Sequence, residues 1–409
     1  DDKGNLKKRI TKGPWHVEEI LKVDNKARVI YFTANGMNPN ENPYYEHLYR
    51  VNLDGSGLKQ LSKGDYFHRV EVDDARFVVD NFSRVNTVPC ADLLDTNGNK
   101  VMTIQESDFS QLFAAGYKFP EPFKVKAADG VTDLYGVMWK PADFDSTKVY
   151  PIISNVYPGP FFEYVPTRFT INDVYNTRLA QLGFIVITVG HRGGTPMRGK
   201  AYHTYGYNNM RDYPLADDKY AIEQLAARYP FIDATKVGIY GHSGGGFMSA
   251  AAICTYPDFY SAAVSSAGNH DNRIYNKGFV EIHFGVDEKV KTTKDSLGVE
   301  STMYDYSVRV RPNQELVKNY KHGLLLFTGA MDKTVNPANT LRLVDALIKA
   351  DKDFEMFVLP KCTHGFFGES EDFLEHKMWR HFARLLLHDN SADSDVDLNK
   401  DMIKDDRRR

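Results

Sequence analysis

A serine flanked by glycines has the surroundings that most clearly suggest chemistry. The run Gly-His-Ser-Gly-Gly at residues 241–245 follows a predicted strand at 237–240 and precedes a predicted helix. A serine in this strand–turn–helix context sits on a sharp turn, and its hydroxyl projects above the sheet. The glycines permit the turn, and the helix N-terminus presents N–H groups to developing negative charge. The motif therefore predicts Ser243 as a nucleophile and the backbone N–H of Gly244 as one oxyanion donor.

A weak alcohol nucleophile needs a base, and the base needs a group to orient it. Asp332 follows a predicted buried strand at residues 323–327, and His364 follows another at 354–359. Their order along the chain, serine then acid then histidine, is the order of the fold that carries this serine turn. We therefore expect His364 to take the proton of Ser243 and Asp332 to hold the imidazole. Taken singly, Asp332 also suits a loop cap and His364 a surface position.

Strands and helices alternate after Tyr117, which indicates a mostly parallel sheet with helices on both faces. The small residues of the predicted helix at 245–255 allow it to lie close to this sheet. We predict strands at 134–140, 151–156, 184–189, 237–240, 260–265, 323–327 and 354–359, and helices at 176–182, 217–228, 245–255, 338–349 and 373–387.

Residues 1–116 show a different pattern, with two successive sets of four short predicted strands. The turns that close each set recur 41 residues apart, at Asp54 and Asp95. Four strands at this period are typical of propeller blades, with a small β-sandwich as the alternative. Two blades cannot close a propeller, so we expect the chain to be a piece of a longer protein. The strands are predicted at 16–24, 28–33, 47–54, 58–61, 67–72, 76–81, 90–95 and 100–104.

Composition narrows the classes of function. The chain has 409 residues, a net charge of −3 and no basic stripe, which argues against nucleic acid as a partner. It contains no run of 18 apolar residues, so we expect no membrane span. Its 3 cysteines exclude a disulfide framework, although one bridge remains open. Motifs for phosphate, zinc and calcium are missing, and we expect no cofactor and no metal.

Several motifs make the chain resemble the prolyl oligopeptidase family of serine peptidases, and within it the dipeptidyl peptidase IV-like branch. The resemblance covers nearly the whole chain. It implies a C-terminal α/β-hydrolase fold with a mostly parallel, doubly wound sheet, preceded by β-propeller blades. It depends on residues 129–130, 134–136, 140–141, 157–160 (Tyr-Pro-Gly-Pro), 192–196 (Arg-Gly-Gly-Thr-Pro), 198–199, 241–245, 332–335 and 364–365.

The resemblance also implies roles for further residues. The hydroxyl of Tyr157 would be the second oxyanion donor, and Tyr275, Phe279 and Val335 would line a substrate pocket suited to proline. The alternative for Tyr157 is a purely structural role, and the alternative for the three pocket residues is that they are ordinary core residues. Three positions depart from the branch pattern and weaken the proline assignment: Gly244 replaces its usual tyrosine, Thr334 an asparagine and Asn272 a tryptophan.

We therefore predict a serine peptidase that removes short N-terminal pieces from peptides, after Pro or Ala, through an acyl-enzyme on Ser243. The alternatives are a carboxylesterase or acylaminoacyl peptidase with the same triad, and a non-catalytic binding module. The predicted domains are a partial propeller at 1–116, a catalytic domain at 117–388 and a polar tail at 389–409. The partner is a peptide, and the resemblance leaves room for a homodimer and favours a periplasmic or secreted protein. We expect Arg192 and Arg198 to form structural ion pairs near the site, with the binding of a substrate carboxylate as the alternative.

Overall fold

Two small antiparallel sheets form the N-terminal part of the computed structural model, which describes residues 3–72, 76–170 and 174–390. They follow the strand orders β1-β2-β3-β4 and β5-β6-β7-β8, so each sheet is built from four consecutive strands as predicted. The described residues form no closed propeller. The strands are β1 (His16–Asp24), β2 (Val29–Asn35), β3 (Glu46–Asn52), β4 (Lys59–Gln60), β5 (Phe67–Val72), β6 (Phe77–Ser83), β7 (Cys90–Asp95) and β8 (Lys100–Glu106).

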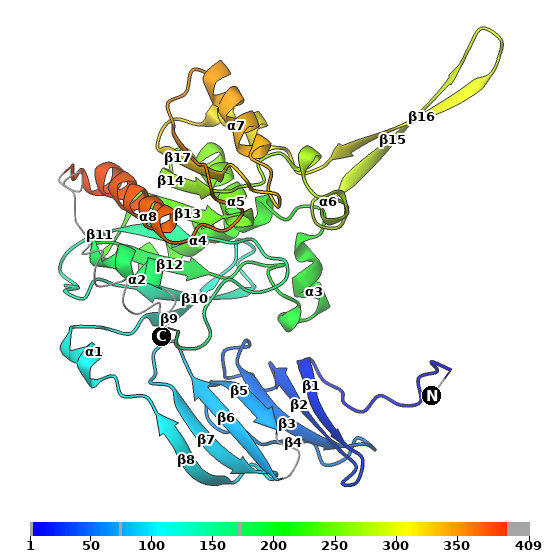
Figure 1. Ribbon diagram of the computed structural model, residues 1–409, viewed down its shortest axis with the longest axis vertical. Helices are drawn as coiled ribbons and strands as arrows, with labels where there is room; N and C mark the ends of the chain where they lie inside the picture. Colours follow the sequence, from blue (N-terminus) through cyan, green and yellow to red (C-terminus); the bar gives the residue numbers. More distant parts are fainter. Residues whose placement is uncertain (1–2, 73–75, 171–173, 391–409) are drawn as a thin grey trace.

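The two small sheets share one apolar cluster. The cluster takes its side chains from β2, β3, β5, β6 and β7 and from the residue after β4. Because successive side chains of a strand point to opposite faces, the alternate residues of β2 and β3 lie on the other face of the first sheet, where they form a separate buried cluster. Burial of the shared cluster holds the two sheets together as one body, which lies below the rest of the molecule in Figure 1. The shared cluster consists of Val29, Tyr31, Leu48, Leu61, Val70, Val78 and Leu94.

An eight-stranded mixed sheet forms the core of the C-terminal part, in the order β18-β17-β14-β13-β11-β12-β10-β9. The six strands from β18 to β12 in this order are parallel, whereas β10 and β9 continue the sheet antiparallel. Strand β9 was not predicted. The bounds are β9 (Glu121–Lys126), β10 (Asp133–Trp139), β11 (Tyr150–Asn155), β12 (Ile185–Val189), β13 (Ile232–His242), β14 (Tyr260–Ser266), β17 (Leu324–Gly329) and β18 (Glu355–Leu359).

Helices cover both faces of this sheet, as the alternating pattern predicted (Figure 1). Helices α4 (Asp212–Arg228), α5 (Gly244–Thr255) and α7 (Ala338–Lys349) contribute to the apolar cluster on one face. Helices α2 (Val174–Gln181) and α8 (Glu369–Phe382) contribute to the cluster on the other. Shorter helices are α1 (Ser110–Ala114), α3 (Lys200–His203) and α6 (Lys277–His283), with 3₁₀ turns at Pro196–Arg198, Thr204–Gly206, Asn272–Ile274, Asn313–Glu315 and Val317–Asn319, and a π turn at Ala383–Leu387.

Several segments differ from the prediction. Strand β13 begins at Ile232 and helix α8 at Glu369, five and four residues before their predicted starts. Helix α4 begins at Asp212, five residues before its predicted start, because Pro214 falls within the first helical turn, where no intrahelical N–H is required. Strands β15 (Val286–Lys294) and β16 (Glu300–Val308) form an unpredicted hairpin that projects away from the domain (Figure 1). Most of its side chains face solvent, so its sequence lacks the apolar alternation by which strands are recognised. The predicted tail beyond residue 390 lies outside the described residues.

Candidate active site

Ser243 occupies the sharp turn between β13 and α5 that the glycine pattern predicted. Its backbone has φ 57° and ψ −119°, a conformation that non-glycine residues rarely adopt. The Ser243 N–H donates to the Ser266 carbonyl at 2.8 Å, which ties the turn to β14. A Cβ at Gly245 would lie 2.1 Å from the Val156 carbonyl oxygen, so only glycine permits this approach. The sheet and the helix therefore hold the strained turn from both sides.

The structure brings the three predicted side chains into one hydrogen-bonded line. His364 Nε2 lies 2.9 Å from Ser243 Oγ, and His364 Nδ1 lies 2.8 Å from Asp332 Oδ2. The other oxygen of Asp332 accepts the backbone N–H groups of Thr334 at 2.8 Å and Val335 at 2.9 Å. With its Nδ1 proton donated to the carboxylate, the imidazole has Nε2 free to accept the serine proton.

The loops that carry the acid and the histidine also contact each other. The Met331 N–H donates to the Cys362 carbonyl at 3.0 Å, which joins the loop after β17 to the loop after β18. The Asp332 side chain is fully buried, whereas that of His364 is 26% exposed. The carboxylate is thus shielded from water, whereas the imidazole remains accessible from solvent. This arrangement is suited to acyl transfer through an alkoxide-like serine.

Tyr157 lies beside the N-terminus of α5, close to the predicted oxyanion position. It lies two residues after the end of β11, and a Cβ placed on Gly244 would be 3.6 Å from Tyr157 Cε2. Burial raises the pKa of the Tyr157 hydroxyl, with smaller contributions from Tyr275 and Tyr164. The phenol is therefore neutral at ordinary pH and can donate a hydrogen bond. The Gly244 N–H, the first of α5, is the other candidate donor.

Comparison with known proteins identifies the family. The model of the prolyl oligopeptidase family matches residues 172–388, and that of the dipeptidyl peptidase IV N-terminal region matches residues 1–89. The chain belongs to the prolyl oligopeptidase family. The first match alone covers more than half of the chain, and it includes all three residues of the hydrogen-bonded line. The resemblance seen in the sequence motifs is thereby confirmed.

Relatives within this family share most of the chain. It is 28% identical to dipeptidyl peptidase 8 of Homo sapiens over 369 residues, which are 87% of this chain and 39% of the relative. It is 27% identical to the probable dipeptidyl-aminopeptidase B of Aspergillus oryzae over 375 residues, 89% of this chain and 39% of the relative. The chain therefore spans about two fifths of the length of these prolyl oligopeptidase family relatives.

Solved structures of similar proteins agree in fold. A putative dipeptidyl aminopeptidase IV from Bacteroides ovatus superposes with a TM-score of 0.79 at 25% identity, covering 93% of this chain and 51% of that one. Dipeptidyl peptidase 4 of Porphyromonas gingivalis gives a TM-score of 0.78 at 22% identity, covering 94% and 52%. The arrangement of small N-terminal sheets beside an α/β sheet is thus shared with these proteins.

The residues predicted to line the substrate pocket of this family member are not equally accessible. The rings of Tyr275 and Phe279 meet edge to face with centroids 5.8 Å apart. Burial, and to a smaller extent the charge of Asp332, raise the pKa of Tyr275. Val335 is only 1% exposed, and its backbone N–H holds Asp332. Tyr275 and Phe279 therefore offer more surface to a ligand than Val335 does.

His242 is a neighbour of the histidine base that the sequence analysis did not single out. Its ring centroid lies 4.9 Å from that of His364, and its Nδ1 lies 3.0 Å from Ser266 Oγ. Burial, together with the nearby His364, lowers the pKa of His242 to about 4. The side chain is therefore neutral at ordinary pH and adds no charge beside the base. Its position directly before the serine was the available signal.

The two arginines of the Arg-Gly-Gly-Thr-Pro segment have different contacts. Arg192 pairs with Asp217 through Nε at 3.0 Å and Nη2 at 2.7 Å, and its Nη1 reaches Asp129 at 3.0 Å. The structural ion pair predicted for Arg192 is thus confirmed. Arg198 instead donates to the Asp133 carbonyl at 2.6 Å and lies 4.3 Å from the centre of the Tyr202 ring.

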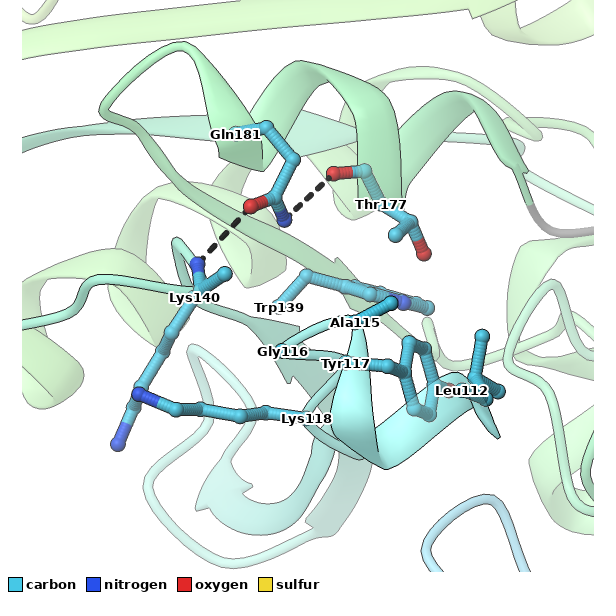
Figure 2. Close-up of a pocket in the computed structure, with 10 residues that line it drawn as sticks. Leu112, Ala115, Gly116, Tyr117, Lys118, Trp139, Lys140, Thr177 and Gln181 are labelled. Atoms are coloured by element: carbon cyan, nitrogen blue, oxygen red, sulfur yellow. Dashed lines mark hydrogen bonds between the residues drawn. The ribbon is translucent and has the colours of Figure 1, made fainter. Parts of the chain in front are cut away.

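A cavity of about 240 Å³ lies away from the serine, between α1, the end of β10 and α2. Figure 2 shows Trp139 and Tyr117 at its wall and Gln181 bonded to the Thr177 carbonyl, and none of the triad residues lines it. Within the described ranges, no group of three potential metal ligands is assembled and no helix has the length and apolar character needed to cross a bilayer. The three cysteines are unpaired.

Proposed function

We propose that this protein is a serine-type dipeptidyl peptidase that acts through an acyl-enzyme on Ser243. The observation that carries the proposal is the line from Ser243 Oγ to His364 Nε2 at 2.9 Å and from His364 Nδ1 to Asp332 at 2.8 Å. The two relatives named as dipeptidyl peptidases support the same reaction class. Roles for Ser243, His364 and Asp332 follow from this geometry.

The reaction proceeds in two halves. Ser243 Oγ attacks the scissile carbonyl carbon while His364 Nε2 takes the hydroxyl proton, and the oxyanion accepts hydrogen bonds from Tyr157 and the Gly244 N–H. His364 then gives that proton to the leaving amine as the C–N bond breaks. Water attacks the resulting ester, His364 again carries the proton, and Ser243 is released with the free acid. Asp332 stabilises the imidazolium throughout.

The proposed specificity is for removal of short N-terminal peptides after Pro or Ala. Tyr275 and Phe279 supply two rings set at 85° to each other, which can enclose a compact pyrrolidine. Val335 would close the apolar wall of this pocket, close to the acid that its N–H holds. The names of the relatives support the dipeptidyl part of this proposal, and the rings support the preference for a small apolar residue.

We propose that the two small sheets are blades of a propeller. Residues 1–116 would form this partial propeller, and residues 117–388 the catalytic domain. The match of residues 1–89 to the dipeptidyl peptidase IV N-terminal region supports this assignment. A peptide is the proposed partner. Homodimer formation is a separate part of the proposal, and sedimentation of the intact protein at several concentrations would test it.

A substrate panel tests the reaction class. We expect hydrolysis of Xaa-Pro and Xaa-Ala amides that have a free N-terminus, and much slower hydrolysis of the same amides when the N-terminus is acetylated. Fast cleavage of short acyl esters without cleavage of these amides would favour a carboxylesterase. Preference for the acetylated amides would favour an acylaminoacyl peptidase.

A fluorophosphonate probe tests whether the scaffold is catalytic at all. We expect stoichiometric labelling of the intact protein at Ser243, located by mass spectrometry of the modified peptide. A protein that binds peptides but is not labelled would instead be a binding module on the same scaffold.

A further inference from the structure

Glu163 lies between the two aromatic residues that contact the proposed oxyanion tyrosine. The ring of Phe162 stacks on that of Tyr157 with centroids 5.4 Å apart and an interplanar angle of 12°. The ring of Tyr164 packs against Tyr157 with centroids 5.6 Å apart. The side chains of Phe162 and Tyr164 are both exposed to solvent, so packing does not fix their outer faces. The Thr188 hydroxyl donates to the Tyr164 carbonyl at 2.8 Å, and Glu163 supplies a second polar anchor between the two rings.

One oxygen of Glu163 is fixed by the loop after β12. Its Oε1 accepts the backbone N–H of His191 at 2.8 Å. Two glycines leave the space for this oxygen, since a Cβ on Gly190 would lie 2.3 Å from Oε1 and one on Gly194 would lie 3.0 Å from it. A Cβ on Gly159 would in turn lie 2.7 Å from the Gly194 Cα. The two loops are thus in close contact on either side of the carboxylate.

The other oxygen is reached from the first N-terminal sheet. Tyr44, in the connection between β2 and β3, donates its hydroxyl to Glu163 Oε2 at 2.7 Å. The Tyr44 side chain is 1% exposed, so this contact is shielded from water. The connection is also anchored by Asn35, whose Nδ2 donates to the carbonyls of Pro43 at 2.6 Å and Met197 at 3.1 Å. The first sheet is therefore joined to the oxyanion loop through side chains.

Arginine and tyrosine side chains complete the surroundings of the carboxylate. The Tyr202 hydroxyl lies 2.9 Å from the His191 carbonyl and 3.3 Å from Glu163 Oε2. Arg198 lies over the Tyr202 ring, and its charge favours the ionised carboxylate. Burial nevertheless dominates and raises the pKa of Glu163 to about 7. These contacts give a role to residues of the segment at 191–199 that the reaction itself does not use.

We propose that Glu163 is a positioning residue for Tyr157 and that Tyr44 links this position to the first N-terminal sheet. The inference rests on the proposed function, because it requires Tyr157 to be an oxyanion donor. Glu163 touches no reacting atom and acts only through the tyrosine. A displaced Tyr157 would lose its hydrogen bond in the transition state, where the oxyanion is fully developed, and substrate binding would change little.

A double-mutant cycle in the intact protein tests the link. We expect Glu163→Gln to lower kcat by about tenfold and to change KM by less than about twofold. In a Tyr157→Phe background the same change should alter kcat by less than about twofold, because the hydroxyl that Glu163 positions is already gone. Tyr44→Phe should show the same pattern with a smaller loss, of about threefold.

Tyr49→Phe is the matched control in the same sheet. Tyr49 is buried, and its hydroxyl contacts Gln60 at 3.3 Å rather than the carboxylate. This variant should retain the kcat of the unaltered protein. Fluorophosphonate labelling of every variant should remain stoichiometric, which shows that the fold and the nucleophile are intact.

The outcomes separate this inference from the proposed function. If Glu163→Gln lowers kcat by the same factor with and without Tyr157→Phe, Glu163 has a general structural role and the inference is overturned. An unchanged kcat for Glu163→Gln would overturn it as well. If the unaltered protein is neither labelled nor active on any amide or ester, the proposed function and this inference fall together.

Discussion

The loop of Ser243 and the loop of Tyr157 meet at one site, but they are held in different ways. Ser243 is fixed by β13, α5 and the Ser266 carbonyl, all within one sheet and the helix packed on it. Tyr157 is flanked by exposed rings, and Tyr44, in the connection between β2 and β3, contacts its loop through Glu163. The proposed nucleophile thus depends on local packing, whereas the loop of the proposed oxyanion donor depends both on the loop after β12 and on a contact with the N-terminal part.

The largest expected effect on kcat comes from a change in the loop of Ser243. Ser243→Ala should lower kcat by about 10⁶, because attack on the carbonyl then has no nucleophile. The fold should not change, since alanine replaces only the hydroxyl on a turn that the neighbouring glycines already permit. Peptide hydrolysis and circular dichroism of the purified variant would measure both. Retention of activity would remove Ser243 from the mechanism.

Asp332→Asn should lower kcat by about 10⁴. Asparagine keeps the size of the side chain, but it places an NH₂ group where the carboxylate oxygen accepts the Nδ1 proton of His364. Because an NH₂ group cannot accept that proton, the imidazole takes the tautomer that is protonated on Nε2, which cannot act as the general base. Steady-state kinetics on an Xaa-Pro amide would measure the loss. A change of less than tenfold would show that Asp332 does not orient the base.

Tyr157→Phe should lower kcat by about 10²–10³, the usual cost of one oxyanion donor. The ring remains and can still stack on Phe162, so the loop should keep its place. KM should change little because the lost bond forms mainly in the transition state. Similar losses in kcat for rapidly and slowly hydrolysed substrates would support Tyr157 as an oxyanion donor. An unaltered kcat would show that other groups donate to the oxyanion.

The smallest expected effect is on the free energy of unfolding, and it concerns His191, whose backbone N–H holds the glutamate next to the Tyr157 loop. The His191 side chain is 2% exposed, and burial lowers its pKa to about 4. In the unfolded chain His191 binds a proton near pH 6.5, whereas in the folded chain it does so only near pH 4. The free energy of unfolding therefore falls as the pH falls from 6.5 toward 4. At pH 5 this loss is on the order of 2 kcal/mol.

His191→Leu should remove this contribution. We expect the difference in unfolding free energy between pH 7.5 and pH 5 to shrink by about 2 kcal/mol in the variant, as measured by urea titration at each pH. Replacement of His322, which is exposed, is the control and should leave that difference unchanged. An identical pH dependence in His191→Leu and the unaltered protein would contradict the assignment.

Much of the fold could be predicted because regular elements carry periodic patterns. Strands β5 and β7 and helix α7 begin and end at the predicted residues, since an alternating strand or an amphipathic helix shows its inner face directly. The β15–β16 hairpin was missed because it buries little of either face. Strand β9 was missed because Pro122 falls within it, and a proline inside a short run argues against a strand or restricts it to a sheet edge.

Ser243, Asp332 and His364 could be named from the chain because each follows a recognisable strand, and parallel strands place their carboxyl ends at one edge. The arrangement that holds Tyr157 could not be found in this way. Tyr44 and Glu163 are 119 positions apart, and neither lies in a pattern that predicts contact. Local propensity and spacing determine elements and their ends, whereas a buried carboxylate finds its donors only when separate sheets fold against each other and exclude water.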